Sequence, residues 1–432
     1  MTIPGKLIRH AVLVATLLAA SSPSLGAGFY SPSVGTPGSL GTAGVANPTN
    51  TRGADAAWTN PAGMTGIDGQ HILTGAQVIV PSLKFNTKDV TNNAFLPRFR
   101  GPVVGDNGGN AGDAAPVTSF FYARPLSDRF VLGFSTTAPL GGGVDYGSDF
   151  VGRYVIRDVF LAGVAVTPSI AYRVTDKLSI GAGVSAIYTV MEQSIAIRQG
   201  LPDPALDGQV KFENLSGWGF QGILGLTYAF NDRLLLGMVY RGEADTDLEG
   251  DVKFQNLRLR DPRLTALLPT SVKISWNNPQ WLEAGLRYRL DEKTQVYFNL
   301  GWQDWSRFSN NVLSFRDDQV VKLDRNWNDT WHAGIAAVRA LNDRSLVSFG
   351  LSYESSPVKD ADRTLDFPVD EQWKLSASYA WNHSDRLAFS LGATLAFVGN
   401  APLEQTAQRV TVRGDYDTNF LAILGGTLRY EF

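Results

Sequence analysis

Two stretches of the chain share one pattern, "YRVTDKLSIG" at residues 172–181 and "YAFNDRLLLG" at residues 228–237. In each, a short polar turn that contains an acid and a base separates two segments in which apolar residues alternate. Looser copies of the turn fall at residues 127–130, 291–293, 342–344 and 384–387. Polar turns between alternating segments predict antiparallel hairpins. Their recurrence roughly every fifty residues predicts that the hairpin is the repeating unit of the fold.

The segments between these turns alternate with a period of two residues. In "FSLGATLAF", residues 389–397, Phe389, Leu391 and Leu395 share one face, while small or polar residues share the other. The stretches "VSFGLSYE" (347–354) and "LSASYAW" (375–381) behave in the same way. This is the period of a β-strand. A soluble sandwich also alternates, so the period alone does not distinguish it from a barrel.

Longer stretches rich in Gly, Asn, Asp and Pro lie between successive short turns, at residues 106–113, 140–149, 201–208, 256–269, 310–324, 357–370 and 399–413. Short turns at one end and long loops at the other are typical of outer-membrane barrels. Each of the six short turns joins two strands into a hairpin. With one more strand before the first hairpin and one after the last, the total is about fourteen strands. We therefore predict an all-β fold, a transmembrane antiparallel β-barrel of about 14 strands.

The two ends of the chain agree with export to an outer membrane. Lys6 and Arg9 precede the apolar run at residues 11–20, and small residues follow it, which predicts a signal peptide at residues 1–26. The chain ends in "GGTLRYEF", where the aromatic Tyr430 and Phe432 lie on one face of a last strand. We expect these two residues to be the signal that the barrel assembly machinery recognises.

Composition excludes several other classes of protein. Hydrophobic residues make up 44%, yet no apolar run beyond the signal is long enough for a membrane helix. Removing the signal takes the net charge from -3 to about -5, which gives no reason to expect nucleic-acid binding. The chain has no cysteine, so it has no disulfide framework and no thiolate metal site.

Motifs for catalysis, metal binding or cofactor binding are weak or absent. The four histidines are scattered, and no G-x-S-x-G nucleophile motif is present, so we predict no metal site, no cofactor and no enzyme activity. Residues 181–186 match G-x-G-x-x-A, but the alternation continues through Tyr188 without a helix start, which favours small residues in a strand. We expect most of the tryptophans at strand ends to form an interfacial girdle: Trp276, Trp281, Trp302, Trp305, Trp327, Trp331, Trp373 and Trp381.

Several segments together resemble one known family. They are residues 27–29 "AGF", 38–46 "GSLGTAGVA", 60–62 "NPA", 146–159 "YGSDFVGRYVIRDV", 305–308 "WSRF", 326–327 "NW" with Thr330, 356–358 "SPV", 363–364 "RT" and 367–376 "FPVDEQWKLS". In these residues the chain resembles the FadL/TodX (OMPP1) family of outer-membrane channels for fatty acids and other hydrophobic compounds. The resemblance covers nearly all of the chain after the signal.

The segment at residues 27–68 is rich in glycine and too poor in apolar residues to bury a core of its own. It is therefore a flexible tail or a segment folded into the lumen. The resemblance implies the second: a hatch at residues 27–68 that plugs a barrel at residues 69–432. It also implies that Asn60, Pro61 and Ala62 belong to the hatch and that Phe29 reaches the ligand pocket.

The resemblance implies further site residues. A kinked third strand opens the wall sideways in the family, and here Pro139, Gly141 and Gly142 would weaken strand pairing at that place. This stretch is either the lateral opening or the start of a loop. Apolar residues of a long outer loop, Leu257, Leu259, Leu264, Leu267 and Leu268, are candidates for a capture groove. Arg153 and Arg157 are candidates for contact with a carboxylate, a lumen group or lipopolysaccharide.

Together these features predict a monomeric channel in the outer membrane of a Gram-negative bacterium, surrounded by lipid and lipopolysaccharide. It would take up long-chain fatty acids or similar hydrophobic molecules passively, by capture in outer loops, binding in a lumen pocket and lateral release. Affinity would grow by about 0.8 kcal/mol per buried methylene. A channel for monoaromatic or alkane hydrocarbons is the alternative within the family. A general porin or an outer-membrane lipase is the alternative from another class.

Overall fold

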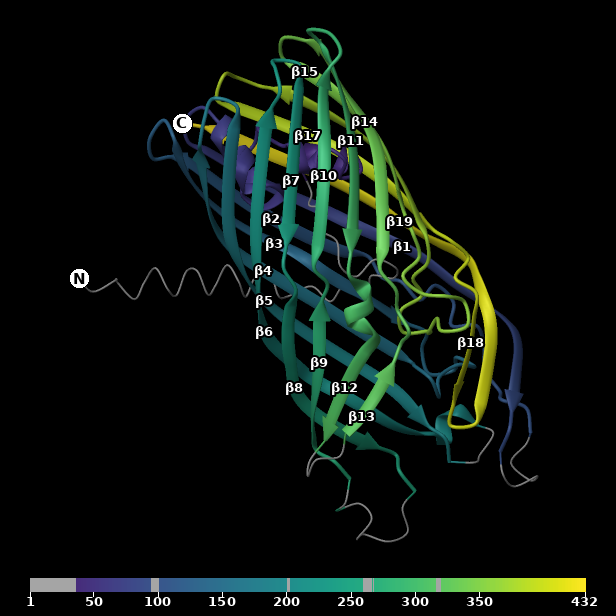
Figure 1. The fold of residues 1–432 in the computed structure, drawn as a ribbon. Helices are drawn as coiled ribbons and strands as arrows, with labels where there is room; N and C mark the ends of the chain where they lie inside the picture. Colours follow the sequence, from purple (N-terminus) through teal and green to yellow (C-terminus); the bar gives the residue numbers. More distant parts are fainter. Residues whose placement is uncertain (1–35, 95–100, 200–202, 259–265, 267, 316–319) are drawn as a thin grey trace.

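The computed structural model describes residues 36–94, 101–199, 203–258, 266, 268–315 and 320–432. The signal peptide and Phe29 lie outside the described residues. All of the described strands belong to one antiparallel sheet that closes on itself, because β1 (His71–Asn92) pairs with β2 (Ala115–Pro125) on one side and with β19 (Val410–Glu431) on the other (Figure 1). No described helix is long and apolar enough to cross a membrane.

The other strands are β3 (Phe130–Asp145), β4 (Asp158–Arg173), β5 (Leu178–Ile197), β6 (Gly208–Ala229), β7 (Leu234–Arg241), β8 (Ala244–Gln255), β9 (Ser271–Asn278), β10 (Trp281–Arg289), β11 (Thr294–Gln303), β12 (Asn310–Phe315), β13 (Val320–Asp324), β14 (Thr330–Asn342), β15 (Ser345–Glu354), β16 (Gln372–Asn382), β17 (Leu387–Val398) and β18 (Leu403–Ala407). Short helices are α2 (Pro37–Leu40), η1 (Asn47–Thr49), α3 (Ala56–Thr59), η2 (Pro61–Gly66), η4 (Pro204–Leu206) and η5 (Trp305–Ser309).

The 19 described strands form a barrel of 14 strands because five barrel strands are interrupted. β7 and β8 are two parts of one of them, since β6 pairs with both. The pairs β9 with β10, β11 with β12, β13 with β14 and β17 with β18 are related in the same way. The predicted barrel of about fourteen strands is thus confirmed.

The six repeated turns of the sequence are the short connections of the barrel, and their first polar residue explains the repeat. The Thr175 hydroxyl accepts hydrogen bonds from the backbone amides of Lys177 and Leu178, at 3.2 and 3.0 Å. The side-chain oxygens of Ser127, Asn231, Asp291 and Ser384 accept from the same two positions in their own turns. Such side chains stabilise a turn by satisfying its free amides.

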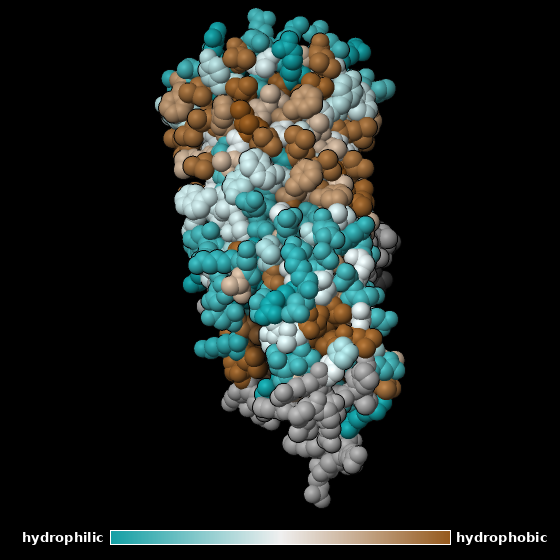
Figure 2. Space-filling model, turned by 90° about the vertical axis from the view of Figure 1, so that its right-hand side faces the viewer, coloured by the Kyte–Doolittle hydropathy of each residue, from teal (hydrophilic) through white to brown (hydrophobic). Residues whose placement is uncertain are grey.

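The polarity of the two faces inverts along the interrupted strand made of β9 and β10. In β10 the apolar Leu282 and Leu286 are exposed outside while Glu283 is buried inside. In β9, which continues the same barrel strand, Val272, Ile274 and Trp276 are buried inside, and Lys273 is exposed. Figure 2 shows the result, an apolar belt over the half of the barrel with the short turns and a hydrophilic surface beyond it. The membrane therefore surrounds the short-turn half, and the other half projects outward.

The described part of the hatch, residues 36–68, lies inside the short-turn half of the barrel (Figure 1). β1 begins at His71, close to the predicted start. Three predicted loops are partly wrong, because strand structure extends into them: β3 continues to Asp145, β12 and β13 form a hairpin within residues 310–324, and β18 pairs with the start of β19. The outer half is thus largely a continuation of the barrel.

Candidate functional site

The outer half of the lumen holds an apolar cluster, called here the outer core. Its buried side chains include Leu83, Phe85, Leu140, Val144, Phe150, Leu161, Leu248, Ile274, Trp276, Trp305, Phe308, Trp327, Leu365, Phe367 and Tyr416. Phe308 lies at its centre, with ring centroids 4.9 Å from Trp276 and 4.7 Å from Trp327. A buried apolar region of this size, enclosed by a barrel, is an environment that a hydrophobic solute prefers to water.

The outer core corrects the predicted girdle. Trp276, Trp281, Trp305 and Trp327 are buried in the lumen rather than exposed to lipid. Trp331 and Trp373, which are 56% and 47% exposed, agree with the girdle. Trp276, Trp305 and Trp327 lie beyond the membrane belt and Trp281 lies at its outer edge, where the inner face becomes apolar. The alternation of residues does not show which face is inside, so these four tryptophans were assigned to the wrong face.

Asn60 joins the hatch to the barrel wall. Its side-chain oxygen accepts from the Ala62 amide at 3.1 Å, which caps η2. Its amide nitrogen donates to the Pro48 carbonyl of the hatch at 2.6 Å and to the carbonyls of Leu226 in β6 and Met238 in β7 at 3.2 and 3.3 Å. The side chain is fully buried. One residue therefore satisfies polar groups of two hatch turns and two strands.

Glycines of the wall let the hatch backbone approach closely. A Cβ added to Gly225 would lie 2.1 Å from the Asn60 oxygen, and one added to Gly237 would lie 1.9 Å from the Pro48 carbonyl oxygen. At Gly181 an added Cβ would lie 2.4 Å from the Ala62 amide nitrogen. Gly181 belongs to the G-x-G-x-x-A stretch, which lies within β5 as predicted. Gly181 has no side chain because the hatch backbone occupies the space that a Cβ would need.

Three inward-facing arginines also bind the hatch, and the sequence did not single them out. Arg241 donates to the Trp58 carbonyl and lies 4.2 Å above the Trp58 ring. Arg173 donates to the Thr65 carbonyl, and Arg287 donates to the Thr51 hydroxyl at 2.9 Å. Each of them stands in a strand whose opposite face is apolar. A cation on the inner face of a lipid-facing strand is the signal that could have identified them.

The wall between β2 and β3 is incomplete in its outer part. The two strands pair only from Phe120 with Thr136 to Pro125 with Val131. Beyond Thr137, β3 has a bulge in which Ala138 and Pro139 together oppose one residue of β4. Pro139 and Leu140 are consecutive and both buried, so the bulge reverses the side-chain alternation. Gly141 and Gly142 follow in β3 and pair with β4 alone.

The gap in β2–β3 pairing is bridged by the connection between β1 and β2. The Ala111 amide donates to the Leu83 carbonyl of β1, and its own carbonyl accepts from the Asp145 amide of β3, at 2.8 and 2.9 Å. Leu140, which belongs to the outer core, adjoins the bulge. The outer core thus reaches the wall at the place where strand pairing is interrupted.

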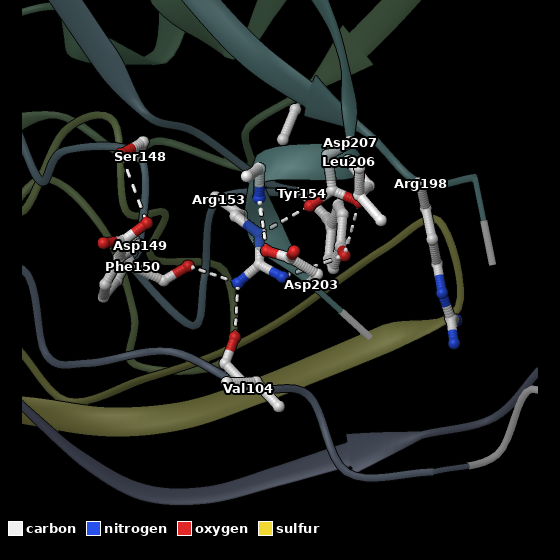
Figure 3. A network of polar contacts seen from close by, with 12 residues as sticks. Val104, Ser148, Asp149, Phe150, Arg153, Tyr154, Arg198, Asp203, Leu206 and Asp207 are labelled. Atoms are coloured by element: carbon white, nitrogen blue, oxygen red, sulfur yellow. Dashed lines mark hydrogen bonds and ion pairs between the residues drawn. The ribbon is translucent and has the colours of Figure 1, made fainter. Parts of the chain in front are cut away.

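Arg153 is part of a buried network that joins three outer connections (Figure 3). Its Nε donates to Asp207 at 2.8 Å, its Nη1 to the Val104 carbonyl at 2.7 Å, and its Nη2 to the Tyr154 hydroxyl at 3.0 Å. Burial is the main reason why the pKa of Tyr154 is raised. The carboxylate that Arg153 contacts in the structure thus belongs to the protein itself.

Arg157 differs from Arg153. Its side chain is half-buried, and no acceptor among the described residues bonds its buried Nε. Contact with a ligand's carboxylate remains a prediction for both arginines. Of the predicted capture loop, Leu257 and Leu268 are described and half-buried, and Leu257 packs against Gly208. Leu259, Leu264 and Leu267 lie outside the described residues.

A second ionic network, missed by the sequence analysis, covers the outer core. Arg325 binds Asp366 through two hydrogen bonds, the shorter at 2.7 Å, and lies 4.9 Å above the Phe367 ring. Burial alone would raise the pKa of Asp366, but the Arg325 charge and hydrogen bonds outweigh it and lower that pKa. Arg363 is almost fully buried and donates to the Val369 carbonyl at 2.8 Å.

At the end of the chain, Tyr430 and Phe432 form an aromatic pair with ring centroids 4.9 Å apart. The Phe432 amide donates to the Gln70 carbonyl at 3.0 Å, just before β1, and its side chain is exposed. Within the described ranges, no group of three or more His, Asp or Glu side chains could hold a metal ion. Recognition of the two aromatic residues during assembly stays a prediction.

Comparison with known proteins agrees with this architecture. Residues 17–432 match the family model described as outer membrane protein transport protein (OMPP1/FadL/TodX). Outer membrane protein P1 of Haemophilus influenzae is 23% identical over 439 residues, which cover 92% of this chain and 89% of that protein. The long-chain fatty acid transport protein of Escherichia coli is 24% identical over 357 residues, 75% of this chain and 78% of that protein.

Solved structures show the same fold. A FadL homologue of Pseudomonas aeruginosa superposes with a TM-score of 0.86 at 19% sequence identity, covering 94% of this chain and all of that one. The toluene transporter TodX of Pseudomonas putida superposes with a TM-score of 0.63 at 17% identity, covering 88% of this chain and 94% of that one.

Proposed function

The chain belongs to the OMPP1/FadL/TodX family of outer-membrane transport proteins, and on that premise we propose that it takes up long-chain fatty acids. Uptake is passive and driven by binding. The fatty acid is captured at the outer connections, binds in the outer core, and leaves sideways between β2 and β3. The protein acts as a monomer in the outer membrane, among lipid and lipopolysaccharide, after insertion by the barrel assembly machinery.

The observation that carries the proposal is the inversion of face polarity. Inside the membrane belt the lumen is filled by the hatch, which packs against both polar and apolar residues of the wall, whereas beyond the belt the lumen holds large apolar side chains. An apolar lumen does not favour the passage of water, ions or sugars. A hydrophobic solute, in contrast, gains about 0.8 kcal/mol of transfer free energy for each methylene that it buries there. The arrangement favours long apolar molecules over sugars and ions.

The hatch and the bulge suggest how the solute leaves. Asn60, Arg173, Arg241 and Arg287 hold the hatch against the wall, so straight passage toward the short-turn end requires several hydrogen bonds to break. Sideways exit at Pro139 requires that the short segment at residues 110–111, which bonds to β1 and β3, moves away from the gap. Displacing one short segment of the β1–β2 connection disturbs less of the molecule than displacing the hatch, which supports lateral release.

Uptake by cells that lack their own channel tests the proposal. Cells expressing the protein, its Asn60→Ala variant or an Asn231→Ala control are given radiolabelled oleate, toluene or a small sugar. Asn231 caps an exposed turn, so its loss leaves the hatch in place. We expect oleate uptake in the wild type and the control, and reduced oleate uptake with sugar leakage in Asn60→Ala.

The other outcomes each exclude part of the proposal. Toluene uptake without oleate uptake would assign the channel to hydrocarbons. Sugar entry into wild-type cells without either hydrophobic compound would indicate a general porin. Ester cleavage that depends on a single serine would indicate a lipase, and in that case transport would not be the activity.

A further inference from the structure

A cavity of about 280 Å³ lies at the short-turn end of the barrel, apart from the outer core. Hatch residues 38–55 form one side, and the inner faces of β14, β15, β17 and β19 form the other. Its mouth carries the exposed Arg52, Asn382 and Arg344, and its depth is formed by the buried Tyr297 and Ser348. The cavity therefore opens at the end of the barrel opposite the outer connections.

The lining is amphipathic. The lining includes small or apolar side chains, among them Ala46, Val338, Ala340 and Leu346. The volume is nearly twice that of an apolar cavity of about 150 Å³, which accepts a benzene ring. A linear alkyl segment of several methylenes fits such a space.

The charges around the cavity are mostly positive. Arg52, Arg287, Arg344 and Arg429 line it, against the two acids Asp55 and Asp343. Among the described residues, neither Arg52 nor Arg344 forms an ion pair, while Arg429 binds Glu431 at 3.2 Å. Arg52 and Arg287 repel each other electrostatically. Burial raises the pKa of Asp55.

We infer that the cavity binds an anionic amphiphile, with its head group on Arg52 and Arg344 and its alkyl part against the hatch and the inner wall. Guanidinium groups bind carboxylates and phosphates with paired hydrogen bonds, and the apolar depth adds the transfer energy of each methylene. The cavity opens at the periplasmic end, apart from the proposed sideways exit, so its ligand enters from the periplasmic side and the inference goes beyond the proposed function. An anionic lipid shares the same head-group chemistry.

A single cysteine tests the site, because the natural chain has none. Ala340→Cys places a thiol in the cavity lining, and its rate of reaction with a small maleimide reports whether the cavity is occupied. The protein is embedded in zwitterionic lipid nanodiscs. We expect decanoate at ten times its Kd to slow the reaction about tenfold, and the uncharged decanol at the same concentration to slow it much less.

Two variants and one lipid control decide the outcome. Arg52→Gln with Arg344→Gln should abolish protection by decanoate, whereas Arg233→Gln, which changes an arginine of a different short turn, should leave it intact. Protection by phosphatidylglycerol nanodiscs without decanoate would identify a lipid as the natural ligand. Equal protection by decanol and decanoate, or protection that persists without both arginines, would overturn the inference. Oleate uptake measured in the same variants tests the proposed function separately.

Discussion

At the scale of single residues, the hatch is held by groups that leave few polar atoms unsatisfied. Asn60 uses both ends of its amide, and the glycines of β5, β6 and β7 bring the wall within reach. A buried amide that loses its partners costs about 1–3 kcal/mol. The side chains that fix the hatch are thus also those that keep the short-turn half of the lumen closed.

Gly225→Ala should loosen the hatch. The added methyl would overlap the Asn60 oxygen, and overpacking of this kind costs about 1–3 kcal/mol. We expect a higher ion conductance in planar bilayers than in the wild type. Gly222→Ala in the same strand is the matched control, because nothing lies within 4 Å of its added Cβ. Equal conductance in the two variants would contradict the close packing described for Gly225.

Asp366→Asn should open the cover of the outer core. The pKa of this carboxyl is lowered below its usual 3.8, so its ion pair stabilises the fold above that pH and is lost only as the pH falls further. The asparagine imitates the protonated state at pH 7 and leaves Arg325 without its partner, at a cost of about 3–5 kcal/mol. Hydrogen exchange of residues 358–370 should become faster.

Asp360→Asn provides the control for this experiment. Asp360 also pairs with an arginine, but it is 71% exposed, and such pairs contribute about 1 kcal/mol or less. Its exchange should change little. In the wild type, exchange corrected for its intrinsic pH dependence should be constant from about pH 8 to about pH 5. A marked loss of protection within that range would show that another group controls the cover.

At the scale of elements, the sequence predicts where the short turns lie, but it does not predict which face of each strand points into the lumen. Residues such as Thr175 and Asn231 mark short turns by local chemistry, which does not depend on the rest of the fold. Trp276 and Trp305 were misplaced because a period of two residues does not tell which face is inside. The inside face changes character where a strand leaves the membrane, and that boundary falls within β9–β10.

In the candidate site, too, some residues could be identified from the sequence, whereas their contacts could not. Asn60 and Pro139 could be named from the resemblance, but their partners in β6, β7 and β4 are far away in the sequence. Arg241 and Arg325 carry no local motif, and only the closed barrel brings them to Trp58 and Asp366. Their roles depend on contacts between distant segments, which a single sequence does not record.

Deleting Pro139 should remove the irregularity at the unpaired edge of β3. The bulge opposes two residues to one of β4, so removing one of the two restores a regular β3–β4 ladder and straightens the edge of β3 that faces β2. We expect oleate uptake to fall about tenfold, a change equivalent to about 1.4 kcal/mol, at unchanged surface abundance. Deletion of Asn214, at the bulge between β5 and β6, is the control and should leave uptake intact. Uptake that survives the loss of Pro139 would argue against lateral exit there.

At the scale of the whole molecule, the barrel is much longer than a membrane requires. A tilted strand crosses the bilayer in about 9–11 residues, whereas β1, β6 and β19 each have 22. The excess forms the outer half, with charged residues outside and the outer core inside. Two environments are thus stacked in one barrel: a lumen plugged by the hatch within the lipid and a lumen with large apolar side chains above it.

The most direct test of the account is to find where a fatty acid lies on its way through the barrel. A photoreactive oleate with a diazirine on its chain is supplied to cells expressing the protein, cross-linked by light and mapped by mass spectrometry. The account predicts labelled peptides from the outer core, including Trp276 and Phe308, and from β3 around Leu140. Label confined to the outer lipid-facing residues or to the hatch, with none in β3, would contradict it.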